Sequence, residues 1–188
     1  MQHGMMELDT AYPARIRRIL GELGIPEDYG ARRQLELQPE ETDLETARVL
    51  TDGRHLRLSR TVLPAWQGLA AAAASDGISL LLISGFRDVD HQRAIIEGKR
   101  ARGIPLDEIL RVNAAPGYSE HHTGRAVDIG TPGCPPLTEA FEQTQAFQWL
   151  SRHAAGFGFR LSYPRGHPHG FIYEPWHWMA AAPVVRPE

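Results

Sequence analysis

The sequence contains very little cysteine and lysine. Cys134 is the only cysteine among 188 residues, so a disulfide within the chain is impossible. Its neighbours Gly133 and Pro135 are typical of a turn, and because no base lies beside it in the sequence, we do not expect a nucleophilic thiol. Lys99 is the only lysine, and the arginines are scattered along the chain. With a net charge of -3, this distribution indicates neither a nucleic-acid nor an anionic-membrane partner.

Long apolar runs are also absent. The longest apolar stretches, Leu69–Ala74 and Ile78–Ile83, are far shorter than the ~20 residues of a membrane-spanning helix. Met1–Glu7 lacks the basic and apolar regions of a secretory signal peptide. We therefore expect a cytoplasmic protein, whereas a start site assigned too far downstream would be compatible with the periplasm. The apolar content of 42% is sufficient for one core of ordinary size, so we expect a single domain.

Apolar residues recur with helical spacing in several parts of the chain. The segments predicted as helices are Tyr12–Leu23, Thr61–Ala74, Asp88–Arg100, Leu106–Leu110 and Leu137–Ala155. Asp88 is the expected N-cap of its helix, because a short acidic side chain can accept hydrogen bonds from the first free backbone N–H groups. On that helix Gln92 is expected to face Arg87, which directly follows a buried strand.

Shorter apolar runs bounded by turn residues predict strands. The segments concerned are Ile78–Ile83, Ala126–Ile129, Gly156–Leu161 and Phe171–Tyr173, with edge strands around Leu35–Leu37 and Val49–Leu50. Gly156–Leu161 and Phe171–Tyr173 are expected to pair as antiparallel strands joined by the loop Tyr163–Gly170. The acidic segment Ile25–Asp52 is expected to be a solvated face without catalytic residues, with a cleft wall as the alternative.

Two distant segments carry groups that bind metals. Gly117–Asp128 contains two adjacent histidines and an aspartate, and the sequence Glu-Pro-Trp-His ends at His177. A catalytic zinc takes three histidine or carboxylate ligands and leaves its fourth position to water. His121, Asp128 and His177 can supply these three ligands if the chain folds so that the segments meet. On spacing alone His122 is an alternative to His121.

The remaining polar groups would complete a hydrolytic site. Zinc lowers the pKa of bound water to about 7, so Glu174 could take its proton and return it to a leaving amine. Arg87 could stabilise the oxyanion that forms on the attacked carbonyl. Such a site hydrolyses an amide. His167 and His169 lie on a loop rich in proline and glycine, where we expect plain solvent exposure.

Four ordered motifs give the chain a family resemblance. Ser119–Asp128 fits S-x-H-x-x-G-x-A-x-D, Glu174–His177 fits E-x-x-H, Ser84–Arg87 with Gln92 fits S-G-[YF]-R…Q, and Phe157–Pro164 resembles G-F-x-x-x-Y-P. Together they resemble the VanY-type zinc D-alanyl-D-alanine carboxypeptidases of the LAS peptidase group. The resemblance covers about Leu58–Met179 and implies a catalytic core over residues 58–179, preceded by an N-terminal helix and acidic extension over residues 1–57.

The resemblance implies a role for each matching residue. The zinc ligands are His121, Asp128 and His177, the catalytic residues are Glu174 and Arg87, and the substrate contacts are Gln92, Tyr118, Ser119 and Trp176. It also implies an α+β fold in which a small antiparallel sheet carries the site and helices flank it. Met179 and Ala180 stand where the family often has arginine and tyrosine, and the His-Pro-His loop is unfamiliar. Because of these departures, the resemblance does not predict which residues form the rim of the pocket.

Members of this family act on peptidoglycan stem peptides that end in D-alanine. A D,D-carboxypeptidase cuts between two D-alanines, and an L,D-carboxypeptidase removes D-alanine from the diamino acid of a tetrapeptide. The expected cytoplasmic location favours the L,D reaction, because a cytoplasmic D,D-enzyme would destroy the pentapeptide precursors of the cell. Alternatives are the D,D reaction, an endopeptidase, or a non-catalytic zinc-containing module that binds peptidoglycan. Glu174 and Arg87 argue against the last of these. The oligomeric state is open.

Overall fold

A four-stranded antiparallel sheet is the centre of the fold. The computed structural model describes residues 8–181, so the segment Met1–Glu7 lies outside the described residues. The strands are β3 (Leu81–Ser84), β4 (Ala126–Gly130), β5 (Phe159–Leu161) and β6 (His177–Ala180), in the order β3-β4-β6-β5. A separate antiparallel hairpin consists of β1 (Leu44–Val49) and β2 (His55–Ser59). The small antiparallel sheet with flanking helices confirms the predicted α+β class.

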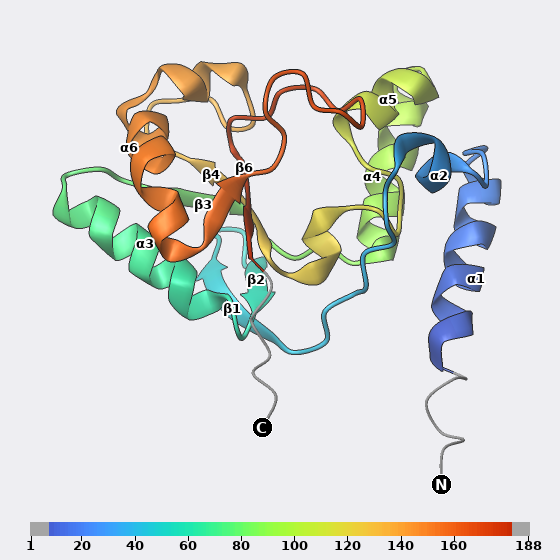
Figure 1. The fold of residues 1–188 in the computed structure, drawn as a ribbon, viewed down its shortest axis with the longest axis horizontal. Helices are drawn as coiled ribbons and strands as arrows, with labels where there is room; N and C mark the ends of the chain where they lie inside the picture. Colours follow the sequence, from blue (N-terminus) through green and yellow to red (C-terminus); the bar gives the residue numbers. More distant parts are fainter. Residues whose placement is uncertain (1–7, 182–188) are drawn as a thin grey trace, which may run out of the picture.

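Helices lie on both sides of the sheet (Figure 1). On one side are α3 (Leu63–Ser75) and α6 (Gln145–His153), and on the other are α1 (Leu8–Glu22), α2 (Tyr29–Arg33), α4 (Val89–Ala101) and α5 (Leu106–Val112). Short 3-10 helices span Glu120–Thr123 (η1), Glu139–Gln143 (η2) and Ala154–Phe157 (η3). Within residues 8–181, no helix has the length and apolarity needed to cross a membrane.

Two apolar cores lie on either side of the site. The first contains residues of the sheet, α3 and α6, among them Leu69, Val127 and Ile129. The second contains residues of α1, α4 and α5, including Ile16 and Ile96. Side chains alternate between the faces of a strand, so β4 turns Val127 and Ile129 to the first core and the intervening residue to the opposite face. That residue is a predicted metal ligand.

The predicted helices in the first two thirds of the chain are confirmed to within a few residues. Helices α1, α3, α4 and α5 occupy the expected segments, although α1 begins four residues earlier than predicted. The cap of α4 is also as predicted, because Asp88 Oδ1 accepts a hydrogen bond from the His91 N–H at 2.7 Å. Gln92 lies buried on this helix.

The single long helix predicted for Leu137–Ala155 was wrong. The segment instead forms η2, α6 and η3 in succession. The break is at Thr144, whose extended backbone (φ -87°, ψ 155°) places Oγ1 to accept a hydrogen bond from Phe147 N–H at 3.2 Å. Thr144 therefore caps a new helix where apolar periodicity alone predicted a continuous one.

Several strand predictions also need correction. Phe171–Tyr173 is not a strand; β5 pairs instead with β6, and Phe159 lies opposite Ala180. Leu35–Leu37 forms no strand either; Leu35 and Leu37 pack against the second core from an irregular segment. Val49 ends β1, and its partner strand β2 was not predicted.

Candidate metal centre and active site

The turn between η1 and β4 brings the predicted ligands together. His121 lies on η1, Asp128 lies in β4, and His177 begins β6 directly opposite Asp128. Gly124 ends η1 with a φ of 63°, and its carbonyl accepts a hydrogen bond from Ser59 N–H at 2.9 Å. A Cβ at Gly124 would lie 2.8 Å from the Ser59 nitrogen, so only glycine fits this turn.

His121 has one ring nitrogen whose lone pair is available to bind a cation. Its Nδ1 donates a hydrogen bond to the Gly85 carbonyl at 2.6 Å, which leaves a lone pair on Nε2. This Nε2 is buried without a hydrogen-bond partner and lies 3.3 Å from Asp128 Oδ2. Burial lowers the pKa of His121 to about 4, so at neutral pH no proton separates the lone pair from the carboxylate. A metal ion between them would fit both groups.

His122 is occupied by hydrogen bonds on both ring nitrogens. Its Nδ1 donates to the Arg87 carbonyl at 2.6 Å, and its Nε2 accepts from Gly117 N–H at 3.0 Å. Neither nitrogen is free to bind a metal. Of the two adjacent histidines that spacing left open, His121 has a ring nitrogen without a hydrogen-bond partner and His122 does not, which favours His121 as the ligand.

Asp128 and His177 form the second half of the centre. His177 Nδ1 lies 3.0 Å from Asp128 Oδ1, and one donor atom each from His121, Asp128 and His177 all lie within 4.8 Å of one another. Burial opposes ionisation of Asp128, but the two imidazoles outweigh it and hold the pKa of this carboxyl well below its usual range. Two histidines and a carboxylate are a ligand set that zinc uses in hydrolytic sites.

Glu120 fixes the orientation of His177. Its Oε2 lies 2.9 Å from His177 Nε2, on the side of the ring away from Asp128. Burial disfavours the charged imidazolium, but hydrogen bonds to Asp128 and Glu120 outweigh it and raise the pKa of His177 to about 10. A metal ion on Nδ1 would replace one proton, and the Nε2–H would still donate to Glu120.

Glu174 and Arg87 lie beside the ligands. Glu174 Oε2 is 3.9 Å from His177 Nδ1, and burial raises the pKa of Glu174 to about 7. Arg87 follows β3, and its Nε is buried without a hydrogen-bond partner. Burial lowers the pKa of Arg87, and the field of Asp128 and Glu174 opposes this effect. The site thus combines a carboxyl suited to proton transfer near neutral pH with a buried cation.

A cavity of about 270 Å³ opens onto these groups. Its lining residues come from β4, β6, α4, α5 and the connecting loops: Arg87, Lys99, Val112, Asn113, His121, Asp128, Leu137, Ile172, Glu174, Trp176 and His177. A recess of about 20 Å³ adjoins it and is lined in part by Gln92 and Ser119. Gln92 Nε2 donates to the Ala114 carbonyl at 2.8 Å, whereas its Oε1 is buried without a partner.

Three of the four predicted substrate contacts line the cavity or the recess, and the fourth does not. Trp176 lines the cavity, and Gln92 and Ser119 line the recess. Tyr118 lines neither space; its ring packs edge-on against Tyr29 at 5.3 Å. The structure therefore brings three of the four residues to the site and places Tyr118 against the N-terminal helices.

The loop with His167 and His169 makes more contacts with the rest of the protein than expected. The two histidines are half-buried, so the prediction of plain solvent exposure was wrong. The His167 ring packs edge-on against Tyr163 at 5.2 Å, and the His169 carbonyl accepts a hydrogen bond from Arg33 Nε at 2.8 Å. Neither histidine lines the cavity at the metal ligands. Their packing is consistent with a role in holding the loop.

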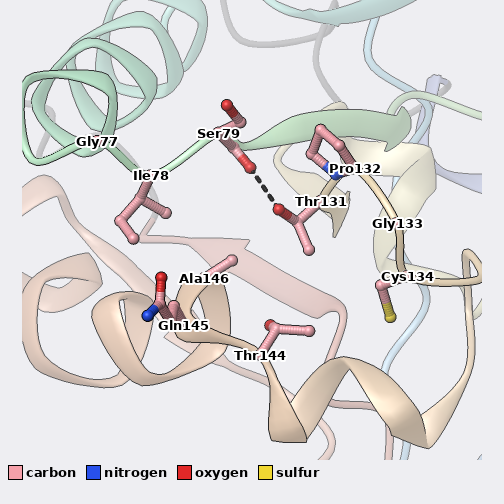
Figure 2. Close-up of a pocket in the computed structure, with 10 residues that line it drawn as sticks. All are labelled: Gly77, Ile78, Ser79, Thr131, Pro132, Gly133, Cys134, Thr144, Gln145 and Ala146. Carbon is pink, nitrogen blue, oxygen red and sulfur yellow. Dashed lines mark hydrogen bonds between the residues drawn. The ribbon is translucent and has the colours of Figure 1, made fainter.

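A second cavity, of about 410 Å³, lies between the loop before β3, the loop after β4 and the start of α6 (Figure 2). It shares no lining residue with the cavity at the metal ligands. Cys134 lines it, and the only hydrogen bond of its Sγ among the described residues is a weak one to the Pro135 carbonyl at 3.6 Å. Within residues 8–181, no hydrogen bond joins this thiol to a basic side chain.

Sequence reasoning missed three polar residues of the site. Glu120 orients a ligand, and Lys99 and Asn113 line the cavity. Glu120 lies directly before His121 in the motif Ser119–Asp128, so its position was a usable signal. Lys99 was visible as the only lysine but had no motif around it. Asn113 follows a short helix, and nothing in the sequence indicated where its side chain would lie.

The fold and these distances define a candidate mononuclear metal site. Two histidines and one aspartate could bind the ion, and a carboxyl and a guanidinium flank them. The family model described as VanY, D-alanyl-D-alanine carboxypeptidase, matches residues 55–181. The chain belongs to this family.

Curated relatives and solved structures are similar to this chain. A D-alanyl-D-alanine carboxypeptidase of Enterococcus faecalis (strain ATCC 700802 / V583) is 30% identical over 150 residues, which cover 74% of this chain and 53% of the relative. The LdcB LD-carboxypeptidase has a TM-score of 0.65 at 29% identity, covering 75% of this chain and 69% of that chain. A mutant of the vancomycin resistance D,D-pentapeptidase VanY in complex with Zn(II) has a TM-score of 0.59 at 28% identity, covering 76% and 80%. The chain spans 40% to 65% of the length of the curated relatives it matches.

Proposed function

We propose that this protein is a zinc-dependent carboxypeptidase that removes the C-terminal D-alanine from peptidoglycan stem peptides. One observation carries the proposal. Three buried metal-binding side chains converge within 4.8 Å, next to a carboxyl whose pKa burial raises to about 7. Membership of the VanY family and the zinc in a related structure support the choice of metal and reaction.

The side chains around the centre have separate tasks. Zinc, when bound by His121, Asp128 and His177, supplies Lewis-acid polarisation of the carbonyl and acidifies the attacking water. Glu174 accepts the proton of that water and later donates it to the nitrogen of the leaving D-alanine. Arg87 places a desolvated positive charge where the carbonyl oxygen becomes negative.

Within this reaction class, an L,D-carboxypeptidase acting on tetrapeptides is our preferred assignment. It rests on the proposed cytoplasmic location, where trimming of recycled tetrapeptides is compatible with survival and cleavage of pentapeptide precursors is not. The similarity to the LdcB LD-carboxypeptidase is compatible with it. The similarity to the D,D-pentapeptidase VanY keeps the D,D reaction as the alternative.

The test combines metal analysis with a digestion assay. The purified protein should contain one zinc per chain and release D-alanine from a tetrapeptide muropeptide. Glu174→Gln should keep the zinc and lower kcat by about 10²–10⁴-fold, because general acid–base catalysis contributes this much. Activity of the unsubstituted protein should decline as the pH falls through about 7, where Glu174 becomes protonated. The exposed Glu139→Gln serves as the matched control.

The outcomes separate the alternatives. Equal D-alanine release by the Glu174 and Glu139 variants would refute the role of Glu174. Release from the pentapeptide only would replace the L,D assignment by the D,D one. Internal cleavage, detected by mass spectrometry of the products, would indicate an endopeptidase. Zinc binding and muropeptide binding without any cleavage would indicate the non-catalytic module.

A further inference from the structure

The single lysine of the chain lies in the cavity at the metal ligands. Lys99 is in the last turn of α4, and its Nζ donates a hydrogen bond to Asn113 Oδ1. Both residues line the cavity, whose only other arginine or lysine is the buried Arg87. Among the described residues, no carboxylate forms an ion pair with Lys99. An ammonium has three N–H donors, so the charge and two donors remain for a ligand.

The mouth of the same cavity has an apolar wall. Val112, Leu137 and Ile172 line it, and Val112 and Leu137 are 38% and 47% exposed. They are two of the three large apolar side chains that the described part of the chain leaves exposed. The Ile172 N–H donates to the Arg111 carbonyl at 3.1 Å and so holds the loop against the end of α5.

Leu137 is held in this wall at a conformational cost. Its φ of 56° lies in the left-handed region, which a leucine adopts at a cost of about 1–2 kcal/mol. Such residues persist where the surroundings require them, often at binding sites. The wall therefore combines exposed apolar area with a backbone that keeps one of its members in place.

The two spaces beside the metal ligands differ in size. The recess of about 20 Å³ holds little more than one water molecule or a methyl group. The cavity of about 270 Å³ has room for a long side chain. The recess thus suits the methyl group of D-alanine, and the cavity suits the side chain of the residue that precedes the cleaved bond.

We infer that Lys99 and the apolar wall select a substrate whose residue before the cleaved bond has an aliphatic side chain ending in a carboxylate. Diaminopimelate is a diamino acid of this kind: its distal carbon carries a carboxylate beside an ammonium, so this end has no net charge and offers acceptor oxygens. The side chain of lysine ends in an ammonium alone, which Lys99 would repel. The aliphatic stem would lie on Val112, Leu137 and Ile172, and the distal carboxylate would accept hydrogen bonds from Nζ. This inference rests on the proposed function and specifies its substrate.

Two tetrapeptides that differ only in the third residue, diaminopimelate or L-lysine, test the inference. Zinc-loaded protein should prefer the diaminopimelate peptide by at least about tenfold in kcat/KM, the range of a hydrogen bond to a charged group. Lys99→Met keeps the length of the stem and should bring this ratio close to one, through a loss on the diaminopimelate peptide and, because the repulsion is removed, no loss on the lysine peptide. Arg102→Met, an exposed basic residue just after the same helix, is the matched control and should leave the ratio unchanged.

Binding measurements keep the test independent of turnover. In a Glu174→Gln background, calorimetry should show the same preference for the diaminopimelate peptide and its loss on Lys99→Met. An equal fall for both peptides would overturn the inference, because Lys99 would then bind the C-terminal carboxylate that both share. An unchanged ratio would overturn it as well. Absence of D-alanine release with the binding preference intact would refute the proposed reaction and leave the selectivity of Lys99 standing.

Discussion

The two walls of the metal cavity are built differently. On the sheet side, His121, Asp128 and His177 are at most 4% exposed, and their polar atoms face one another at 3.0 to 3.3 Å. On the helix and loop side, Val112 and Leu137 are 38% and 47% exposed. The sheet wall can hold a metal geometry rigidly, and the other wall can vary without disturbing it. In the proposed function, metal binding and selection of substrate therefore depend on separate elements.

The largest expected contrast is between the adjacent histidines of the sheet wall. Loss of a group that only supports a ligand lowers metal affinity by up to about 100-fold. His121→Ala removes a ligand itself and should therefore weaken zinc binding by more than this. His122→Ala should retain one zinc per chain but lower the free energy of unfolding by about 1–3 kcal/mol, because two buried backbone groups lose their partners. Zinc competition with a chelator and denaturant unfolding measure the two effects. Loss of zinc in both variants would break the distinction.

A smaller effect is expected one step away from the metal. Glu120→Gln keeps an acceptor oxygen but removes the charge that His177 Nε2–H faces at 2.9 Å, so zinc affinity should fall by about 10–100-fold. The exposed Glu139→Gln should leave the affinity unchanged. If the Glu120 variant bound zinc as tightly as the control, the hydrogen bond between Glu120 and His177 would not contribute to zinc affinity.

The smallest effect is expected on the opposite wall. Leu137→Asn places a residue that tolerates the left-handed region at φ 56°, so stability should stay the same or rise by about 1 kcal/mol. Zinc affinity should not change, because this side chain contributes no ligand. Loss of apolar contact should raise KM several-fold with kcat nearly unchanged. A change in zinc affinity would show that the two walls are coupled.

The sheet wall was predictable because its residues are tied to local pattern. The strand pattern of Ala126–Ile129 predicted that Asp128 would share a face with Ala126, opposite Val127 and Ile129, and Asp88 predicted the start of α4. Spacing could not distinguish His121 from His122, because both lie on the same short η1 turn. The distinction depends on Gly85, Arg87 and Gly117, whose backbone groups reach the rings only in the folded chain.

The helix and loop wall was not predictable, because its residues meet only in the folded chain. Lys99 and Asn113 meet through the packing of α4 against α5, which no local pattern encodes. Leu137 was expected inside a helix, but its left-handed backbone lies outside one. The departures from the family pattern at Met179 and Ala180 concern buried residues of β6, so they do not form the mouth of the cavity.

The pairing of Asp128 with His177 across β4 and β6 ties metal affinity to strand alignment. If β6 were displaced by a single residue along β4, the indole of Trp178 would replace the imidazole beside the aspartate, and every side chain of that strand would change faces. A chain misfolded in this way could not bind the ion. Added zinc would therefore shift the population of refolding molecules toward the correctly aligned sheet, and the yield of native protein should depend on its concentration.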